Sequence, residues 1–172
     1  MTVQPSKARY FAIGKADAWR EVHRLSLVET QPAGEARVEL RNSSSWWQLE
    51  TAGWAADEGD NAIAFVPADV PEGAALVLSA YRKDVSIGDT ELRKLTENGA
   101  PSTVRRVPVR CGDFRGFHAT YDAEESHWRV WWLASRATHV YATFNCARGY
   151  AGRHDAVLDW MLATLREVRH DA

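Results

Sequence analysis

The sequence predicts an α+β protein in which a mostly antiparallel sheet of about six to eight strands is covered by helices on both faces. Strand-like runs follow one another with short turns between most of them, which favours antiparallel hairpins. The central runs carry apolar residues at both odd and even positions, so both faces of the sheet need a cover. Residues 153–168 repeat apolar residues at helical spacing, and they supply one such cover.

At 172 residues the chain is expected to form one domain, 1–172. Folding a domain of this size buries about 70% of the surface that the unfolded chain exposes, so a sizeable core is available. Residues 1–35 predict an N-terminal extension or helix, and residues 36–172 hold the sheet and its helices. The apolar residues of the extension at helical spacing are Trp19, Val22 and Leu25.

The strands and helices then follow in a regular order. The first four strand-like runs are 36–41, 46–50, 61–67 and 75–81. The turns expected between them are 43–45, 57–60 and 67–73. Residues 88–101 predict a short helix that begins at Asp89 and stops at Gly99 and Pro101, and a strand resumes over 102–110.

Two hairpins connect strands near 114–122, 127–135 and 138–146. Their register places Trp131 opposite Ala142 and beside His118. Because successive side chains of a strand point to opposite faces, the adjacent Trp131 and Trp132 must serve different layers. We name the two sides of the sheet the Trp131 face and the Trp132 face, and we expect both rings to be core. The other aromatic residues expected on the Trp132 face are Phe117, Tyr121, Trp128 and Tyr141.

Charge and hydropathy exclude several classes of partner. The formal net charge is −2 and no basic run extends beyond Arg105-Arg106, so nucleic acid is not an expected partner. No segment approaches the ~20 apolar residues of a membrane helix, so no membrane association is expected. The N-terminal residues hold no apolar run of signal-peptide length, which predicts a cytoplasmic protein.

The two cysteines are predicted to stay reduced. The hairpin register places Cys111 and Cys146 at opposite ends of the sheet, roughly 30 Å apart at ~3.3 Å per strand residue. Bridged Cα atoms lie about 5.5 Å apart, so a disulfide is excluded on this register. Free thiols suit a cytosolic compartment.

The histidines predict neither a metal site nor a cofactor site. His118, His127, His139 and His154 show no HxH or HxxxH spacing, and zinc needs its ligands within ~2.1 Å of one point. His118 beside Trp131 is expected to be a hydrogen-bonded structural histidine, with a catalytic role as the alternative.

No catalytic residue is predicted. Asp122, Glu124 and Glu125 meet His127 around one turn, where charged residues are expected for solvation. Cys111 could be a nucleophile, but no argument places a histidine beside it. The sequence also lacks GxSxG, HExxH, GxGxxG and a Walker loop.

The eight tryptophans are the remaining signal. Most are expected in the core, but Trp46 shares its strand parity with Gln48 and Glu50, which predicts an exposed ring. Trp54, at a Gly-Trp turn, is the next candidate. The speculative binding residues are Trp46, Trp54, Asp57, Glu58 and Asp60. Exposed aromatic rings beside an acidic loop would suit a basic protein partner.

Residues from about Ser45 to Val168 resemble small bacterial domains of uncharacterised function in the PsbP-like α/β/α sandwich class. The segments that carry the likeness are W47-QLETAG-W54, A74-ALVLSAYR-K83, G112-DFRG-F117, W128-RVWWL-A134 and Y141-ATFN-C146. The resemblance implies the fold, a non-catalytic binding or assembly role, and for some relatives a role as immunity partners of secreted toxins. It implies no catalytic residue.

Three functions therefore stay open. The preferred one is a non-catalytic protein-binding module, with an immunity or antitoxin-type partner of a bacterial toxin as its most specific form. The second is a small-ligand-binding protein that uses a pocket between the sheet and a helix. The third is an enzyme built around His118, Asp122 or His127. A homodimer through a sheet edge or the Trp46 surface is also possible.

Overall fold

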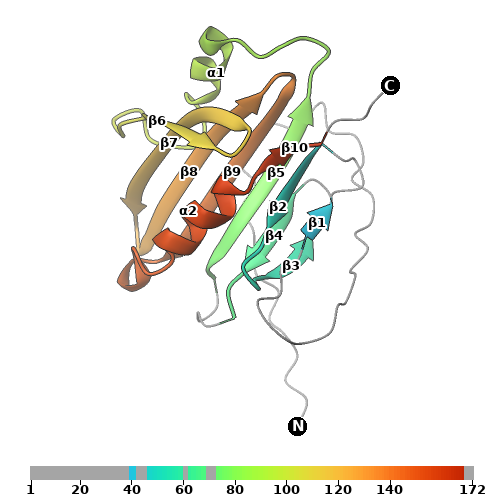
Figure 1. Cartoon of the computed structure of the whole chain (residues 1–172). Coiled ribbons are helices and arrows are strands. Elements are labelled where there is room, and N and C mark those ends of the chain that lie inside the picture. The colour runs from blue at the N-terminus through green and yellow to red at the C-terminus, as the bar shows by residue number, and fades with distance from the viewer. Residues whose placement is uncertain (1–38, 42–45, 60–61, 69–72, 169–172) are drawn as a thin grey trace.

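The computed structural model describes the backbone of residues 39–41 and the whole of residues 46–59, 62–68 and 73–168. The predicted N-terminal helix lies outside these residues. Within the described ranges the chain forms a seven-stranded sheet, a three-stranded sheet and two α-helices (Figure 1). This confirms a mostly antiparallel α+β fold. None of the described helices is long and apolar enough to cross a membrane.

The large sheet has the order β3-β4-β5-β9-β8-β7-β6, and each neighbouring pair is antiparallel. Its strands are β3 (Ala55–Glu58), β4 (Ile63–Val66), β5 (Ala75–Arg82), β6 (Val107–Cys111), β7 (Phe114–Ala123), β8 (Ser126–Ser135) and β9 (Thr138–Ala147). The small sheet contains β1 (Glu39–Arg41), β2 (Trp47–Glu50) and β10 (Arg166–Glu167). The helices are α1 (Asp89–Leu95), α2 (Asp155–Ala163) and a 3₁₀ turn at Arg148–Tyr150.

The predicted hairpin register is confirmed. Trp131 lies opposite Ala142 on β9 and opposite His118 on β7. Both adjacent tryptophans are 1% exposed, yet they belong to separate core clusters. Because successive side chains of β8 point to opposite faces, Trp131 and Trp132 pack into different layers, as expected.

The Trp131 face is covered by α2 and the small sheet, and Figure 1 shows α2 and β10 on the same side of the large sheet. Helix α2 presents Leu158, Met161 and Leu162, all at most 1% exposed, to this face. The core residues that meet them from the sheets include Trp47, Leu49, Phe114, Trp131, Leu133 and Phe144. This is the main core of the protein.

The Trp132 face is covered at one end by α1 and the loop that follows it. Leu92 of α1 packs with Ala134, while Leu95 packs against Trp132. The Trp132 indole Nε1 donates a hydrogen bond of 2.9 Å to the carbonyl of Asn98. The loop is held by Arg106, whose guanidinium lies 5.7 Å from the Trp132 ring centre and donates to the carbonyls of Thr96 and Ala100 at 3.1 Å each. Because Arg106 closes this loop, the strand predicted to begin at residue 102 begins only at Val107.

Two further expectations about the elements are wrong. The predicted turn at 57–60 is in part strand, because Ala55–Glu58 pair with Ile63–Val66 as β3. The C-terminal helix ends at Ala163 instead of continuing to Val168. There the Thr164 hydroxyl donates to the Met161 carbonyl at 2.7 Å and accepts from the Glu50 amide at 2.9 Å. The backbone of Arg166–Glu167 then pairs with β2, so strand pairing replaces the last helical turn.

Candidate functional site

The predicted tryptophan surface is only partly exposed. The alternation of β2 is confirmed, since Trp47 and Leu49 are buried while Trp46 is half-buried and packs against the main core. Trp54 is 9% exposed, so its predicted exposure is wrong. Its ring lies 6.2 Å from Phe144 and 5.6 Å from His154, measured between ring centres. The turn before α2 delivers His154 to this position, which sequence spacing does not reveal.

The acidic part of the predicted surface lies on β3. Asp57 is exposed and Glu58 is half-buried, and both belong to the strand at one end of the large sheet. Asp60 lies outside the described residues. The structure therefore places Asp57 and Glu58 on the end strand of the large sheet and Trp54 in the core.

The two thiols are free, as predicted, and buried. Burial raises the pKa of Cys111 to about 11, the nearby Asp159 raises it further, and Arg129 opposes this rise. Burial also raises the pKa of Cys146, with Asp155 and Asp122 adding to it. Since the thiolate is the nucleophilic form, neither cysteine is suited to covalent catalysis.

We expect native protein to leave both thiols unmodified by a thiol-specific disulfide reagent at pH 7.5. Cys111 and Cys146 are 4% and 1% exposed, and a raised pKa leaves little thiolate at this pH. Absorbance of the released chromophore measures the reaction, and denatured protein, which should yield two equivalents, is the control. Rapid reaction of either thiol in the native state would contradict this prediction.

His118 belongs to a polar cluster between the sheet and α2. Its ring stacks on Trp131 with 4.8 Å between ring centres, and its Nε2 lies 3.2 Å from the Thr120 hydroxyl. Arg129 Nε donates to the same Nε2 at 3.3 Å. Burial lowers the pKa of His118 to about 4, the positive charge of Arg129 lowers it further, and Asp159 and Asp155 oppose this. His118 is therefore neutral at physiological pH and accepts hydrogen bonds, which fits the structural role preferred from the sequence.

Arg129 ties the large sheet to α2. Its side chain is 8% exposed and donates to Asp155 at 2.9 Å and to Asp159 at 2.7 Å. The guanidinium also lies 4.8 Å from the centre of the Trp131 ring. All three nitrogens of the guanidinium therefore have partners within the fold. We infer that this cluster anchors the helix.

Asp122 and His127 form a second polar pair, 2.7 Å apart. In the strand register Cys146 lies opposite His127. Asp122, His127 and Cys146 therefore occupy neighbouring positions on β7, β8 and β9. The order imitates a carboxylate, a base and a nucleophile. However, Cys146 is 1% exposed and its pKa is raised, so the row lacks an accessible nucleophile. Within the described ranges, no group of three His, Cys, Asp or Glu side chains could hold a metal ion.

We expect the free energy of unfolding to fall as the pH drops from about 6.5 to about 4. Burial, with a smaller contribution from Lys83, lowers the pKa of His139 to about 4, and His118 has a similarly lowered value. Both rings stay neutral in the folded state over this range, while the unfolded chain binds protons. The stabilisation is thus complete above pH 6.5 and is lost toward pH 4.

Urea unfolding at several pH values measures this dependence. Carboxylates also become protonated near pH 4 and lose stabilising interactions, so a variant is needed to identify the contribution of His118. His118→Gln keeps an acceptor for Arg129 but cannot titrate, and it should reduce the slope between pH 6.5 and 5. An unchanged slope in this variant would contradict the assignment to His118.

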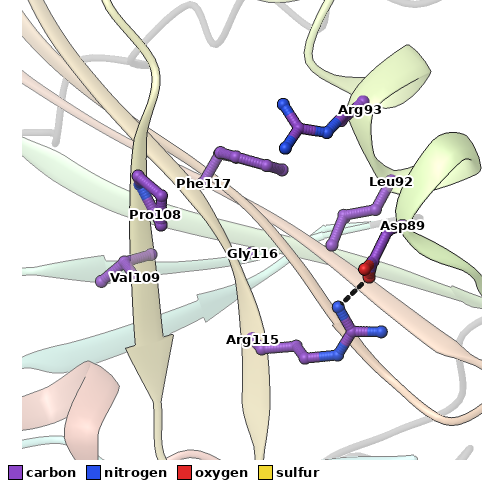
Figure 2. Close-up of a pocket in the computed structure, with 8 residues that line it drawn as sticks. All are labelled: Asp89, Leu92, Arg93, Pro108, Val109, Arg115, Gly116 and Phe117. Atoms are coloured by element: carbon purple, nitrogen blue, oxygen red, sulfur yellow. Dashed lines mark hydrogen bonds and ion pairs between the residues drawn. The ribbon is translucent and has the colours of Figure 1, made fainter.

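An open cleft lies between α1 and the β6–β7 hairpin (Figure 2). Its volume is about 270 Å³. The residues that line it are Asp89, Leu92, Arg93, Pro108, Val109, Arg115, Gly116 and Phe117. Figure 2 shows the Arg115 side chain reaching Asp89, with which it forms an ion pair, and the Arg93 guanidinium beside the ring of Phe117.

Sequence reasoning missed the charged residues of this cleft. Arg93 lies on α1 and Arg115 on β7, and they meet only because the helix folds back over the hairpin. The usable signal was FRGF at 114–117, where Arg115 and Phe117 share a face and Gly116 indicates a close approach of backbone. Since Phe117 belongs to the aromatic Trp132 face, the cleft lies where a pocket between sheet and helix was anticipated.

Neither a protein-family model nor a curated protein matches the chain. A crystal structure of a protein from Bacteroides thetaiotaomicron VPI-5482, at 1.50 Å resolution, has a similar fold with a TM-score of 0.60. The sequences are 16% identical, and the match covers 80% of this chain and 50% of that chain. This chain thus spans about half the length of that protein. The likeness shows a shared fold alone.

Proposed function

We propose that the chain is a non-catalytic protein-binding module of the PsbP-like α/β/α class that acts in the cytoplasm and pairs with a basic protein partner along β3. The observation that carries the proposal is an exposed, acidic strand at the end of the large sheet. Ala55, Ala56 and Asp57 are all exposed on this strand. Helix α2 on the Trp131 face and α1 on the Trp132 face support the class.

Some backbone N–H and C=O groups of β3 point away from β4 and could pair with a strand of another protein. The Gly59 amide donates to the Ala62 carbonyl at 2.9 Å, and hydrogen-bonded pairs alternate along an antiparallel ladder. The peptide groups of Asp57 therefore point toward β4, and those of Ala56 point away from it. Among the described strands, none pairs with this outer edge of β3. An added strand would gain main-chain hydrogen bonds here.

The two ends of the large sheet differ in how they resist pairing. Proline and basic residues are common protective devices on edge strands. The opposite edge, β6, carries Pro108 and Arg110, whereas the sequence of β3 is AADE. The exposed carboxylate of Asp57 would attract Lys or Arg of a partner and favour encounter with it. An immunity protein that binds a basic, nuclease-type toxin is the specific form of this proposal.

Comparative affinity capture tests the proposal. The full chain, Ala56→Pro and Asp57→Lys serve as baits in lysate of the native host, and Glu97→Lys, an exposed acidic residue on the loop after α1, is the matched control. We expect a basic protein to be recovered with the wild-type chain and the control, and to be lost with the two β3 variants. Circular dichroism establishes that the variants are folded. Equal recovery with Asp57→Lys, or recovery of this chain alone, would overturn the proposal.

A second candidate function is small-ligand binding, which the cleft beside α1 favours. The cleft combines apolar side chains with a few charged groups, the usual composition of ligand sites. It lies at the β6–β7 end of the sheet, away from β3 in the strand order, so the two candidate sites can be tested separately.

A further inference from the structure

We propose that the cleft between α1 and the β6–β7 hairpin binds a small organic anion, in which an apolar or aromatic group carries one carboxylate or phosphate. This inference rests on the second candidate function and adds the class of ligand. Three apolar residues on the α1 side of the sheet would hold the body of the ligand. They are Leu92, Pro108 and Phe117, whereas the side chain of Val109 packs against the main core.

Among the residues that the structure describes, the charged groups of the cleft leave the guanidinium of Arg93 available for an anion. Asp89 is the single carboxylate among the lining residues, and it already pairs with Arg115. The other acidic residue of α1, Glu91, pairs with Lys83. Arg93 is exposed, and its guanidinium lies 5.3 Å from the centre of the Phe117 ring. The cleft therefore carries a net positive charge that an anionic ligand would balance.

The guanidinium of Arg93 is well placed to bind an oxyanion. A planar guanidinium donates two parallel hydrogen bonds to a carboxylate or phosphate, and its contact with Phe117 restricts its orientation. The Phe117 ring also lines the apolar part of the cleft, together with Leu92. A ligand would thus place its charge on Arg93 and its apolar group beside Phe117 and Leu92. This geometry selects for molecules that have both parts.

The volume limits the size of the ligand. At about 270 Å³, the cleft is slightly smaller than the roughly 300–1,000 Å³ that is usual for small-molecule sites. One ring or one branched chain with its anionic group fits this space. A free small molecule is therefore the favoured occupant, and an extended peptide is the competing one.

Titrations followed by two-dimensional amide NMR test the inference with defined probes. Benzoate and phenyl phosphate carry both parts, benzyl alcohol lacks the charge, and acetate and inorganic phosphate lack the apolar group. We expect benzoate or phenyl phosphate to shift the amide resonances of α1 and β7. The probe that binds more tightly shows whether the cleft prefers a carboxylate or a phosphate. The probes with one part should bind at least about fivefold more weakly, since each part contributes binding energy.

Two variants distinguish binding in the cleft from non-specific binding elsewhere on the protein. Arg93→Gln should weaken binding about tenfold, because it removes a charge-assisted hydrogen bond. Arg105→Gln, which alters an exposed arginine away from the lining residues, should leave binding unchanged. Equal binding to wild type and Arg93→Gln, or of benzyl alcohol and benzoate, would overturn the inference. Binding of a peptide that ends in phenylalanine, without binding of either small anion, would overturn it in favour of a peptide site.

The outcome is independent of the β3 proposal. If no probe binds the cleft, the small-ligand function fails, while capture of a basic partner through Asp57 is unaffected. If the probes bind but Asp57→Lys captures as much partner as wild type, only the β3 proposal fails.

Discussion

Replacing Gly116 by alanine is expected to lower the free energy of unfolding by about 3 kcal/mol or more, the upper range for overpacking a close contact. A Cβ atom at Gly116 would lie 1.8 Å from the carbonyl oxygen of Trp132 and 2.8 Å from its carbonyl carbon. Both are backbone atoms of the adjacent strand, so no side-chain rotation can relieve the contact. Strands β7 and β8 would have to separate where Gly116 pairs with Leu133.

Gly149→Ala is the matched control for this change. An added Cβ at Gly149 meets nothing within 4 Å, so the same methyl group should alter stability by less than about 0.5 kcal/mol. Urea unfolding followed by tryptophan fluorescence measures both variants. A loss for Gly116→Ala as small as that of the control would show that β7 and β8 approach less closely than described.

Replacing Arg129 by alanine is expected to lower the free energy of unfolding by about 2–3 kcal/mol. The expected loss lies at or below the lower limit of the roughly 3–5 kcal/mol for breaking a fully buried ion pair, because the side chains of Asp155 and Asp159 are 48% and 64% exposed. The variant loses the hydrogen bonds to both carboxylates and the packing against Trp131. It also leaves two like charges four residues apart on α2.

Three further measurements define the role of Arg129. Amide hydrogen exchange of Met161 and Leu162 should accelerate in Arg129→Ala if the helix loses its anchor. A double-mutant cycle with Asp159→Asn should show a coupling energy of at least about 0.5 kcal/mol. Arg105→Ala, at an exposed arginine, should change stability by less than about 0.5 kcal/mol. If Arg129→Ala matches that control, the cluster does not stabilise the fold.

Much of the central sheet could be predicted from residue patterns. The turns at residues 123–126 and 135–138 are short, and without a β-bulge each allows a single strand register. Counting residues from these turns therefore predicted that Trp131 pairs with Ala142 and His118. The assignment of Trp131 and Trp132 to different layers followed for the same reason. The free cysteines followed from strand length.

The prediction was less successful where chain ends and long-range contacts decide the structure. β3 was assigned to a turn because AADE lacks β-branched and aromatic residues, and pairing with β4 outweighs that weak propensity. α2 was predicted too long because its apolar spacing continues through Leu165 and Val168. Thr164 and the pairing of β10 with β2 end the helix earlier. Trp54 was expected at the surface because its cover, His154, lies a hundred residues later in the chain.

The sequence by itself determined the α+β class, the hairpin register, the two-sided core of the sheet and the reduced state of both thiols. Each depends on local periodicity, which side-chain alternation converts directly into position. Only the tertiary structure decided that Trp54 is buried, that β3 is an acidic edge, and that Arg93, Arg115 and Phe117 meet in one cleft. These features arise where segments distant in sequence pack together, and the packing of α1 over β7 is set by complementary surfaces that no local pattern encodes.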